Sequence, residues 1–180
     1  PSQRIRARLH MITHSPSRRI IDAADFSSIR EEAQYLDVFS PVENEIMIDA
    51  GAYDGATSLR FLKWGGENIR RIYAFEFDKL NAVKCEENLK SCAEKITLIK
   101  KGTWDKDEII YTDASGGEDS SLQNSGKDAV QLTAIDNVVK DERVTFIKMD
   151  VEGAELKSLM GARNTIINNR PRLAICAYHK

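Results

Sequence analysis

Three things are scarce in this sequence: long apolar runs, cysteine and net charge. The longest apolar runs are only a few residues, whereas a helix needs about 20 apolar residues to cross a bilayer, so we expect no membrane span. The three cysteines, an odd number at unremarkable spacing, argue against a disulfide framework and fit a reducing, cytoplasmic compartment. No Cys-x-x-Cys pair or Cys/His cluster indicates a metal site, so we predict none. A net charge of −2 gives no general attraction to nucleic acid, so no nucleic-acid partner is expected.

The rest of the composition is that of a globular domain. With 180 residues, 42% hydrophobic and 30% charged, the chain can bury a sizeable core, and we assign that domain to residues 41–180. Residues 1–40 are interpreted as a basic arm and a helical segment. The first nineteen residues carry five arginines and no acid, and residues 20–39 have a helical pattern with a cap at Asp25 or Ser27. A solvated arm is the plain interpretation, and a phosphate- or lipid-binding arm is the alternative.

From residue 45 onward the apolar pattern alternates between strands and helices. This alternation predicts an α/β fold, in which a doubly wound, mostly parallel sheet has helices on both faces. The predicted strands are residues 45–51, 71–77, 96–102, 143–149 and 172–178, and the predicted helices are residues 56–64, 78–92 and 154–168. Segments 108–113 and 129–135 are expected to form a short β-hairpin insertion, and residues 115–127 between them are expected to close over the site as a lid.

Two of these helices have apolar positions that predict which side is buried. In the helix over residues 78–92, Asp78 is the expected N-cap. Its inward face is predicted to consist of Ala82, Cys85, Leu89 and Cys92. In the helix over residues 154–168, the inward face is predicted to consist of Leu156, Leu159, Met160 and Ile167.

Polar residues and glycines lie at the end of every predicted strand of the main sheet. Ligands of open α/β sheets bind in the crevice at the carboxyl ends of the strands, so these residues are candidates for a site. They are Asp49, Gly51, Ala52, Tyr53 and Gly55 at the first strand, Glu76, Phe77 and Asp78 at the second, Gly102, Thr103 and Trp104 at the third, Asp150 and Glu152 at the fourth, and Tyr178 and His179 at the fifth.

The loop after the first strand indicates a nucleoside ligand without a pyrophosphate. Gly51 and Gly55 resemble part of a dinucleotide fingerprint, but Tyr53 replaces the glycine that lets the backbone approach a pyrophosphate. Glu76 follows Gly51 by 25 residues, close to where an acid would accept hydrogen bonds from both ribose hydroxyls. Together these features favour S-adenosylmethionine. The alternative interpretation is a tight turn followed by a solvated glutamate.

Four segments, "IDAGAYDGATS", "IYAFEFDKLN", "FIKMDVEGAELKSLMGA" and "PRLAICAYHK", resemble the FkbM family of S-adenosylmethionine-dependent methyltransferases. The resemblance runs from about residue 43 to residue 180. It implies a class I, Rossmann-like fold, S-adenosylmethionine as cofactor, and O-methylation of a hydroxyl on a sugar or secondary metabolite. Family members usually continue past "YHK" into two further strands, so the resemblance also implies an incomplete acceptor-facing edge here.

These observations predict a role for each candidate residue. The cofactor-binding residues are predicted to be Asp49, Gly51, Ala52, Tyr53, Gly55, Glu76, Phe77, Asp78, Gly102, Thr103, Trp104 and Asp150. The catalytic residues are predicted to be Asp150, Glu152 and His179, which would surround the acceptor hydroxyl and remove its proton. A divalent cation held by the same three side chains is the alternative. Glu155 is expected to cap or complement the helix that it begins.

Two other functions remain open from the residues alone. A nicotinamide-dependent oxidoreductase would share the topology, although Tyr53 and the lack of a Tyr-x-x-x-Lys pair argue against it. A non-catalytic binding module is the other. The expected partner is a small-molecule or glycan acceptor with a free hydroxyl, and the sequence does not indicate an oligomeric state.

Overall fold

A computed structural model of the chain describes residue 36, residues 38–112 and residues 128–176. The chain divides into two units, Pro1–Ser40 and Pro41–Lys180, and every element below belongs to the second unit. The predicted helical segment at 20–39 lies almost entirely outside the described residues, as do the predicted lid at 115–127 and His179. Those three expectations therefore stay predictions.

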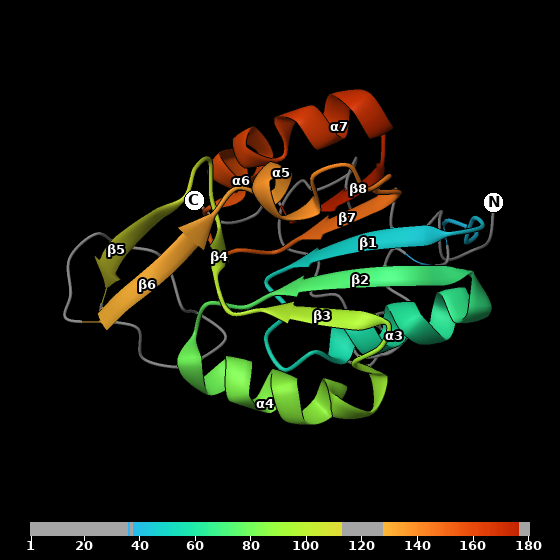
Figure 1. Cartoon of the computed structure of the whole chain (residues 1–180), viewed down its shortest axis with the longest axis horizontal. Helices are drawn as coiled ribbons and strands as arrows, with labels where there is room; N and C mark the ends of the chain where they lie inside the picture. Colours follow the sequence, from blue (N-terminus) through green and yellow to red (C-terminus); the bar gives the residue numbers. More distant parts are fainter. Residues whose placement is uncertain (1–35, 37, 113–127, 177–180) are drawn as a thin grey trace, which may run out of the picture. The chain divides into compact units, whose positions relative to one another are not determined.

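Five parallel strands form the main sheet, as the sequence pattern predicted (Figure 1). They are β1 (Glu45–Ala50), β2 (Ile69–Phe75), β3 (Ile96–Ile99), β7 (Phe146–Met149) and β8 (Arg172–Ile175). Their order across the sheet is β3-β2-β1-β7-β8. The chain builds outward from β1 to β3 and later returns to add β7 on the other side of β1, so the strand order reverses between β1 and β7.

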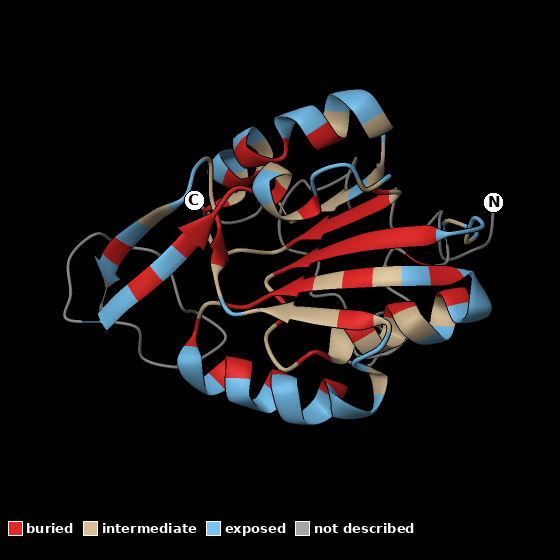
Figure 2. Cartoon of the chain, viewed as in Figure 1, coloured by how far each residue is buried: buried red, intermediate tan, exposed pale blue. Residues whose placement is uncertain are grey.

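Helices cover both faces of this sheet (Figure 1). One face carries α3 (Ala56–Gly65) and α4 (Lys79–Leu89), and the other carries α5 (Ile135–Val139), α6 (Glu155–Gly161) and α7 (Arg163–Asn169). Two short 3₁₀ turns, η1 (Gly66–Asn68) and η2 (Lys90–Cys92), follow α3 and α4. All six residues of β1 are buried, as expected for a central strand with helices on both sides (Figure 2).

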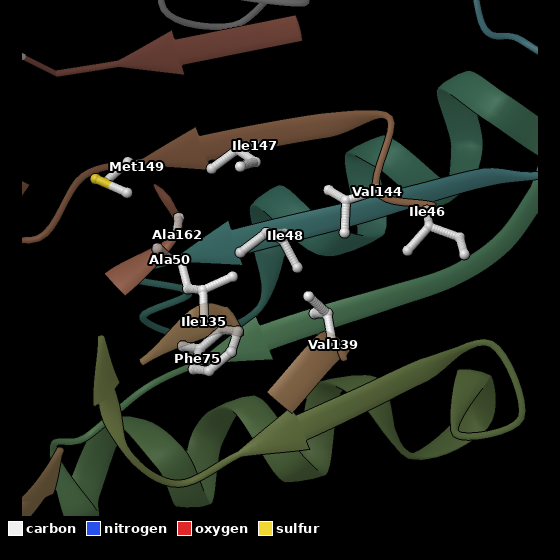
Figure 3. Close-up of a cluster of buried hydrophobic side chains, with 10 residues drawn as sticks. All are labelled: Ile46, Ile48, Ala50, Phe75, Ile135, Val139, Val144, Ile147, Met149 and Ala162. Atoms are coloured by element: carbon white, nitrogen blue, oxygen red, sulfur yellow. The ribbon is translucent and has the colours of Figure 1, made fainter. Parts of the chain in front are cut away.

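The apolar core between the sheet and helices α5–α7 is built from alternate strand residues (Figure 3). Its members include Ile46, Ile48 and Ala50 of β1, Phe75 of β2, Ile147 and Met149 of β7, and Ile135 and Val139 of α5. Because successive side chains of a strand point to opposite faces, the intervening residues of β1 face α3. Asp49 accordingly accepts a hydrogen bond from Ser58 of α3.

The predicted hairpin insertion is confirmed and belongs to a second, smaller sheet. This sheet consists of β4 (Gly102–Thr103), β6 (Asp128–Thr133) and β5 (Glu108–Thr112), in that order, with β5 antiparallel to β6. The predicted third strand was too long, because β3 ends at Ile99 and Gly102 already pairs with Leu132 of β6. Ile110, Val130 and Leu132 form the core of the smaller sheet.

The prediction for the helix at 154–168 was wrong in two respects. The segment forms two helices that meet at Ala162, and its buried residues are mostly small: Ala154, Ser158, Gly161, Ala162 and Thr165. A Cβ at Gly161 would lie 1.8 Å from the carbonyl oxygen of Trp104, so this side lies too close to the neighbouring backbone for large side chains. Of the four residues predicted to face inward, Leu156, Met160 and Ile167 are therefore exposed, and Leu159 alone packs against the core.

The predicted face of the helix at 78–92 is confirmed except at its end. Ala82, Cys85 and Leu89 are buried, but Cys92 is only partly buried. The α-helix ends at Leu89, and the residues that follow form the 3₁₀ turn η2, so Cys92 no longer continues the buried face of the helix.

Burial raises the pKa of the Cys85 thiol to about 12, which makes this thiol unreactive near neutral pH. None of the three cysteines forms a disulfide bond.

An ionic network joins three strands at their amino-terminal ends. Glu45, the first residue of β1, is 1% exposed; it pairs with the Arg172 guanidinium of β8 and accepts a hydrogen bond from the Thr145 hydroxyl just before β7. We expect Glu45→Gln to lower the free energy of unfolding by about 2 to 3 kcal/mol, because it leaves a half-buried guanidinium without its charge partner. Urea denaturation measures this loss. The same change at exposed Glu67 is the control and should cost less than about 0.5 kcal/mol.

Candidate functional site

The candidate site lies where the strand order reverses, at the carboxyl ends of β1 and β7. Here the Asp150 N–H donates to the carbonyl of Ala50 over 3.1 Å. Gly51 has a φ of 78°, and a Cβ there would lie 1.9 Å from the Asp150 carbonyl oxygen. Gly51 is therefore required both for its left-handed backbone and for the close approach of the two chain segments.

The loop from Gly51 to Ala56 is fixed by hydrogen bonds from its own amides. The N–H groups of Gly51 and Ala52 both donate to the carbonyl of Phe75, over 3.1 and 2.9 Å. The remaining donations are Tyr53 N–H to Glu76, Gly55 N–H to the Ala52 carbonyl and Ala56 N–H to the Asp54 carboxylate. Five amides of this loop are thus satisfied within the protein, which leaves little of the backbone nest that binds a pyrophosphate.

Glu76 joins this loop to the end of β2. Its Oε2 accepts the Tyr53 N–H and its Oε1 accepts the Asp78 N–H, each over 2.8 Å. Burial raises the pKa of the Glu76 carboxyl from 4.5 to about 7, and the two N–H bonds offset only part of this shift. The alternative interpretation of a solvated glutamate is therefore wrong.

This raised pKa predicts a pH-dependent stability. Between pH 4.5 and 7 the folded protein keeps the Glu76 proton while the unfolded chain has lost it, so stability falls as pH rises and then levels off above pH 7. The full shift corresponds to about 3 kcal/mol. Urea unfolding of wild type and Glu76→Gln between pH 5 and 8 isolates this term. As pH rises, the free energy of unfolding of the wild type should fall by about this amount relative to that of the Gln variant. If the two plots of unfolding free energy against pH run parallel, Glu76 titrates normally.

The predicted cofactor-binding residues at the ends of the second and third strands have structural contacts of their own. Phe77 and Trp104 both pack against the core of the smaller sheet. The Thr103 hydroxyl lies 2.6 Å from the Ser158 hydroxyl, and a Cβ at Gly102 would lie 2.7 Å from the Leu132 side chain. The predicted N-cap is confirmed, since Asp78 Oδ1 accepts the N–H groups of Leu80 and Asn81. Contact of these residues with the cofactor stays a prediction.

The turn after β7 has an unusual backbone. Glu152 has a φ of 52° and Gly153 a φ of 92°, and a left-handed conformation is costly for a residue with a side chain. Asp150 and Glu152 are both half-buried. Glu155 lies in the first turn of α6, and its Oε1 accepts the N–H of Val151, four residues before the helix, over 3.2 Å. Its predicted capping role stays a prediction. His179 lies outside the described residues.

The described part of the chain contains neither a candidate metal cluster nor a candidate membrane-spanning helix. No group of three or more His, Cys, Asp or Glu side chains within residues 36, 38–112 and 128–176 has an arrangement that could hold a metal ion. Within the same residues, no helix combines the length and the apolar character that a bilayer crossing requires.

One residue that contacts the glycine loop was not predicted from the sequence. Lys148 of β7 is buried, and its ammonium lies 3.2 Å from Asp49 Oδ1 and 2.6 Å from the Gly51 carbonyl oxygen. Asp49 Oδ2 accepts the Ser58 hydroxyl over 2.7 Å. The sequence did contain a signal for this ion pair: one predicted buried strand has a lysine between apolar residues, and another has an aspartate. Asp49 itself is 0% exposed, and its predicted contact with the cofactor stays a prediction.

A family model and a solved structure both match this chain and point to the same protein family. Residues 49–180 match the model of the methyltransferase FkbM domain, which is about three-quarters of the chain. Methyltransferase FkbM from Methylobacillus flagellatus KT has a similar crystal structure, with 29% identity and a TM-score of 0.65 over 79% of this chain and 34% of that one. The chain thus spans about a third of that protein. None of the curated proteins matches the sequence significantly.

A second solved structure is more distant. It is a protein assigned as an rRNA methylase from Clostridium thermocellum, with 14% identity and a TM-score of 0.46 over 74% of this chain and 57% of that one. A similarity at this level carries no argument about function.

Proposed function

Because the chain belongs to the FkbM methyltransferase family, we propose that it binds S-adenosylmethionine at the carboxyl ends of β1 and β2 and methylates a hydroxyl oxygen. The acceptor would be a small molecule or glycan. The observation that carries this proposal is the pairing of Glu76 with a loop whose amides are already used. That combination suits a ligand with a ribose and no phosphate.

Glu76 has the right chemistry for a ribose. An ionised carboxylate offers about four lone-pair sites on its two oxygens, and the two backbone N–H groups use two of them. Both ribose hydroxyls can donate to the others. Such charge-assisted hydrogen bonds favour the ionised form, so ligand binding would lower the Glu76 pKa from about 7 and release a proton.

The occupied amides argue against the oxidoreductase. A dinucleotide needs free backbone N–H groups at the glycine loop to hold its pyrophosphate. Here the amides of Gly51 and Ala52 donate to Phe75, and that of Tyr53 donates to Glu76. Binding a pyrophosphate would require these bonds to break, whereas a sulfonium cofactor leaves them intact.

Methyl transfer requires alignment and the removal of one proton. S-adenosylmethionine, if bound at the ends of β1 and β2, would supply a methyl group for in-line transfer from its sulfur to the acceptor oxygen, and would leave as the neutral thioether. We propose that Asp150 takes the hydroxyl proton at its carboxylate, and that Glu152 and His179 orient the acceptor. The position of Asp150 directly after β7, beside the β1 loop, supports its part in this assignment.

Calorimetric titration of the wild-type protein tests the cofactor. S-adenosylmethionine should bind with a dissociation constant in the micromolar range, as enzyme ligands commonly do, and NAD should show no heat. The affinity should fall about tenfold for each pH unit below 7, because the ligand must then displace the Glu76 proton. Tight NAD binding without S-adenosylmethionine binding would overturn the proposal. In a protein whose unfolding shows the raised Glu76 pKa, an affinity that does not change between pH 5 and 8 would remove Glu76 from the site.

A further inference from the structure

Beneath the glycine loop lies a pair of buried opposite charges. Asp49 of β1 and Lys148 of β7 stand opposite each other in the parallel pairing, and their exposed fractions are 0% and 6%. The neighbours of Lys148 in β7, Ile147 and Met149, are fully buried apolar residues. Burying two charges in such a strand pair is expensive, and well-packed apolar residues often serve stability equally well. Stability alone therefore does not account for the pair.

The contacts of Lys148 indicate what the pair does. A lysine ammonium has three donors and no acceptor. Here it donates to two acceptors, the Ala50 carbonyl at 3.3 Å and the Gly51 carbonyl at 2.6 Å, and it forms an ion pair without a hydrogen bond to Asp49 Oδ1 at 3.2 Å. The shortest contact is with Gly51, where β1 ends and the loop begins. The ammonium thus holds the backbone at the point where it enters the candidate site.

Gly51 is, with Gly55, one of the two glycines that give this loop its greatest conformational freedom. A glycine adopts positive and negative φ about equally well, and Gly51 has a φ of 78°. A charge-assisted hydrogen bond to its carbonyl removes that freedom. The orientation of the next peptides follows, including the Tyr53 N–H that donates to Glu76. When a loop is already held in its binding conformation, ligand binding loses less free energy to ordering that loop.

We propose that Lys148 is a positioning residue for the cofactor: by holding the Ala50 and Gly51 carbonyls, it keeps the glycine loop and Glu76 in the geometry that receives the ribose. The cofactor part of this inference rests on the proposed function. The competing explanation is that Lys148 only neutralises Asp49. The positioning and the neutralising explanations predict different cofactor affinities for a variant in which both charges are removed together.

The test compares Asp49→Asn with the double variant Asp49→Asn/Lys148→Met, and uses Lys148→Met and Ser58→Ala alongside. Lys148→Met alone leaves a buried carboxylate unpaired and should lower the melting temperature strongly. The double variant removes both charges and should recover most of that loss. Ser58→Ala removes the bond to the other Asp49 oxygen without touching the Gly51 carbonyl, so it is the matched control.

Two measurements separate positioning from neutralisation. By calorimetry, the double variant should bind S-adenosylmethionine at least about tenfold more weakly than Asp49→Asn, whereas Ser58→Ala should stay within about threefold of wild type. By NMR hydrogen exchange on the ligand-free proteins, the Tyr53 amide should lose at least about tenfold of its protection in the double variant relative to Asp49→Asn. The exchange measurement needs no cofactor.

The outcomes are distinguishable. Equal affinity and equal Tyr53 protection in Asp49→Asn and the double variant would overturn the positioning role and leave Lys148 as a counter-charge. A wild-type protein that does not bind S-adenosylmethionine would overturn the proposed function instead. In that case the Tyr53 exchange rates would still decide whether Lys148 holds the loop.

Discussion

Replacing Asp150 by Asn is expected to lower methyl transfer by about two to four powers of ten, the usual contribution of a positioned base. The substitution keeps the shape of the side chain and removes its charge. The Asp150 N–H still donates to the Ala50 carbonyl, so the fold should persist. Transfer of a radiolabelled methyl group from S-adenosylmethionine to a panel of sugar-bearing acceptors measures the loss, and urea denaturation monitors the fold.

Asp141→Asn is the control for this experiment. It is the same chemical change at an exposed residue just before β7, at the other end of the strand, and should leave methyl transfer within about twofold, as expected for a surface substitution far from the site. An Asp150→Asn variant with wild-type activity would mean that the carboxylate serves only the architecture of the turn. Equal losses in both variants would point to a general effect of charge.

Replacing Gly51 by Ala is expected to lower the free energy of unfolding by at least about 4 kcal/mol, which is exceptional for a single substitution. A left-handed φ costs a residue with a Cβ about 1 to 2 kcal/mol, and the new Cβ would also lie 1.9 Å from the Asp150 carbonyl oxygen. That oxygen belongs to the backbone and cannot turn aside as a side chain would. Urea denaturation measures the effect.

Gly66→Ala provides the comparison, because Gly66 also has a positive φ, of 55°, but no atom outside its chain neighbours lies within 4 Å of the position of its Cβ. With a ψ of −124° its backbone lies in a region that residues with a Cβ rarely adopt, so the variant should lose only this conformational part, about 1 to 3 kcal/mol. The difference between the two variants therefore isolates the close approach of β1 and β7. Similar losses in both would show that the loop shifts to relieve the clash.

Much of the fold could be predicted because local patterns and long-range packing agree. The alternation of apolar strands and helices predicts the parallel sheet, and the Asp78 cap follows from residue type and position alone. The prediction failed where a contact distant in sequence determined the outcome. Nothing within α6 and α7 indicates that Gly161 lies against the backbone of Trp104, and that contact turns the small residues inward and leaves Leu156 exposed.

The candidate site likewise has features that the sequence predicts and contacts that it does not. The sequence predicts which residues follow the strands, and Gly51 and Glu76 do meet in one place. It does not predict that the Glu76 carboxylate bonds an amide 23 residues away, nor that Lys148 reaches the Gly51 carbonyl from 97 residues away. These contacts depend on strand register, which sequence pattern alone leaves open. The lid at 115–127 and the role of His179 stay predictions.

The central claim is that the ribose of S-adenosylmethionine binds Glu76 at the end of β2. A crystal structure with S-adenosylhomocysteine tests it most directly. We expect both ribose hydroxyl oxygens within about 2.5 to 3.0 Å of the Glu76 carboxylate, while the amides of Gly51 and Ala52 remain bonded to the Phe75 carbonyl. A ligand whose ribose turns away from Glu76, or that binds elsewhere than at the carboxyl ends of β1 and β2, would contradict the account.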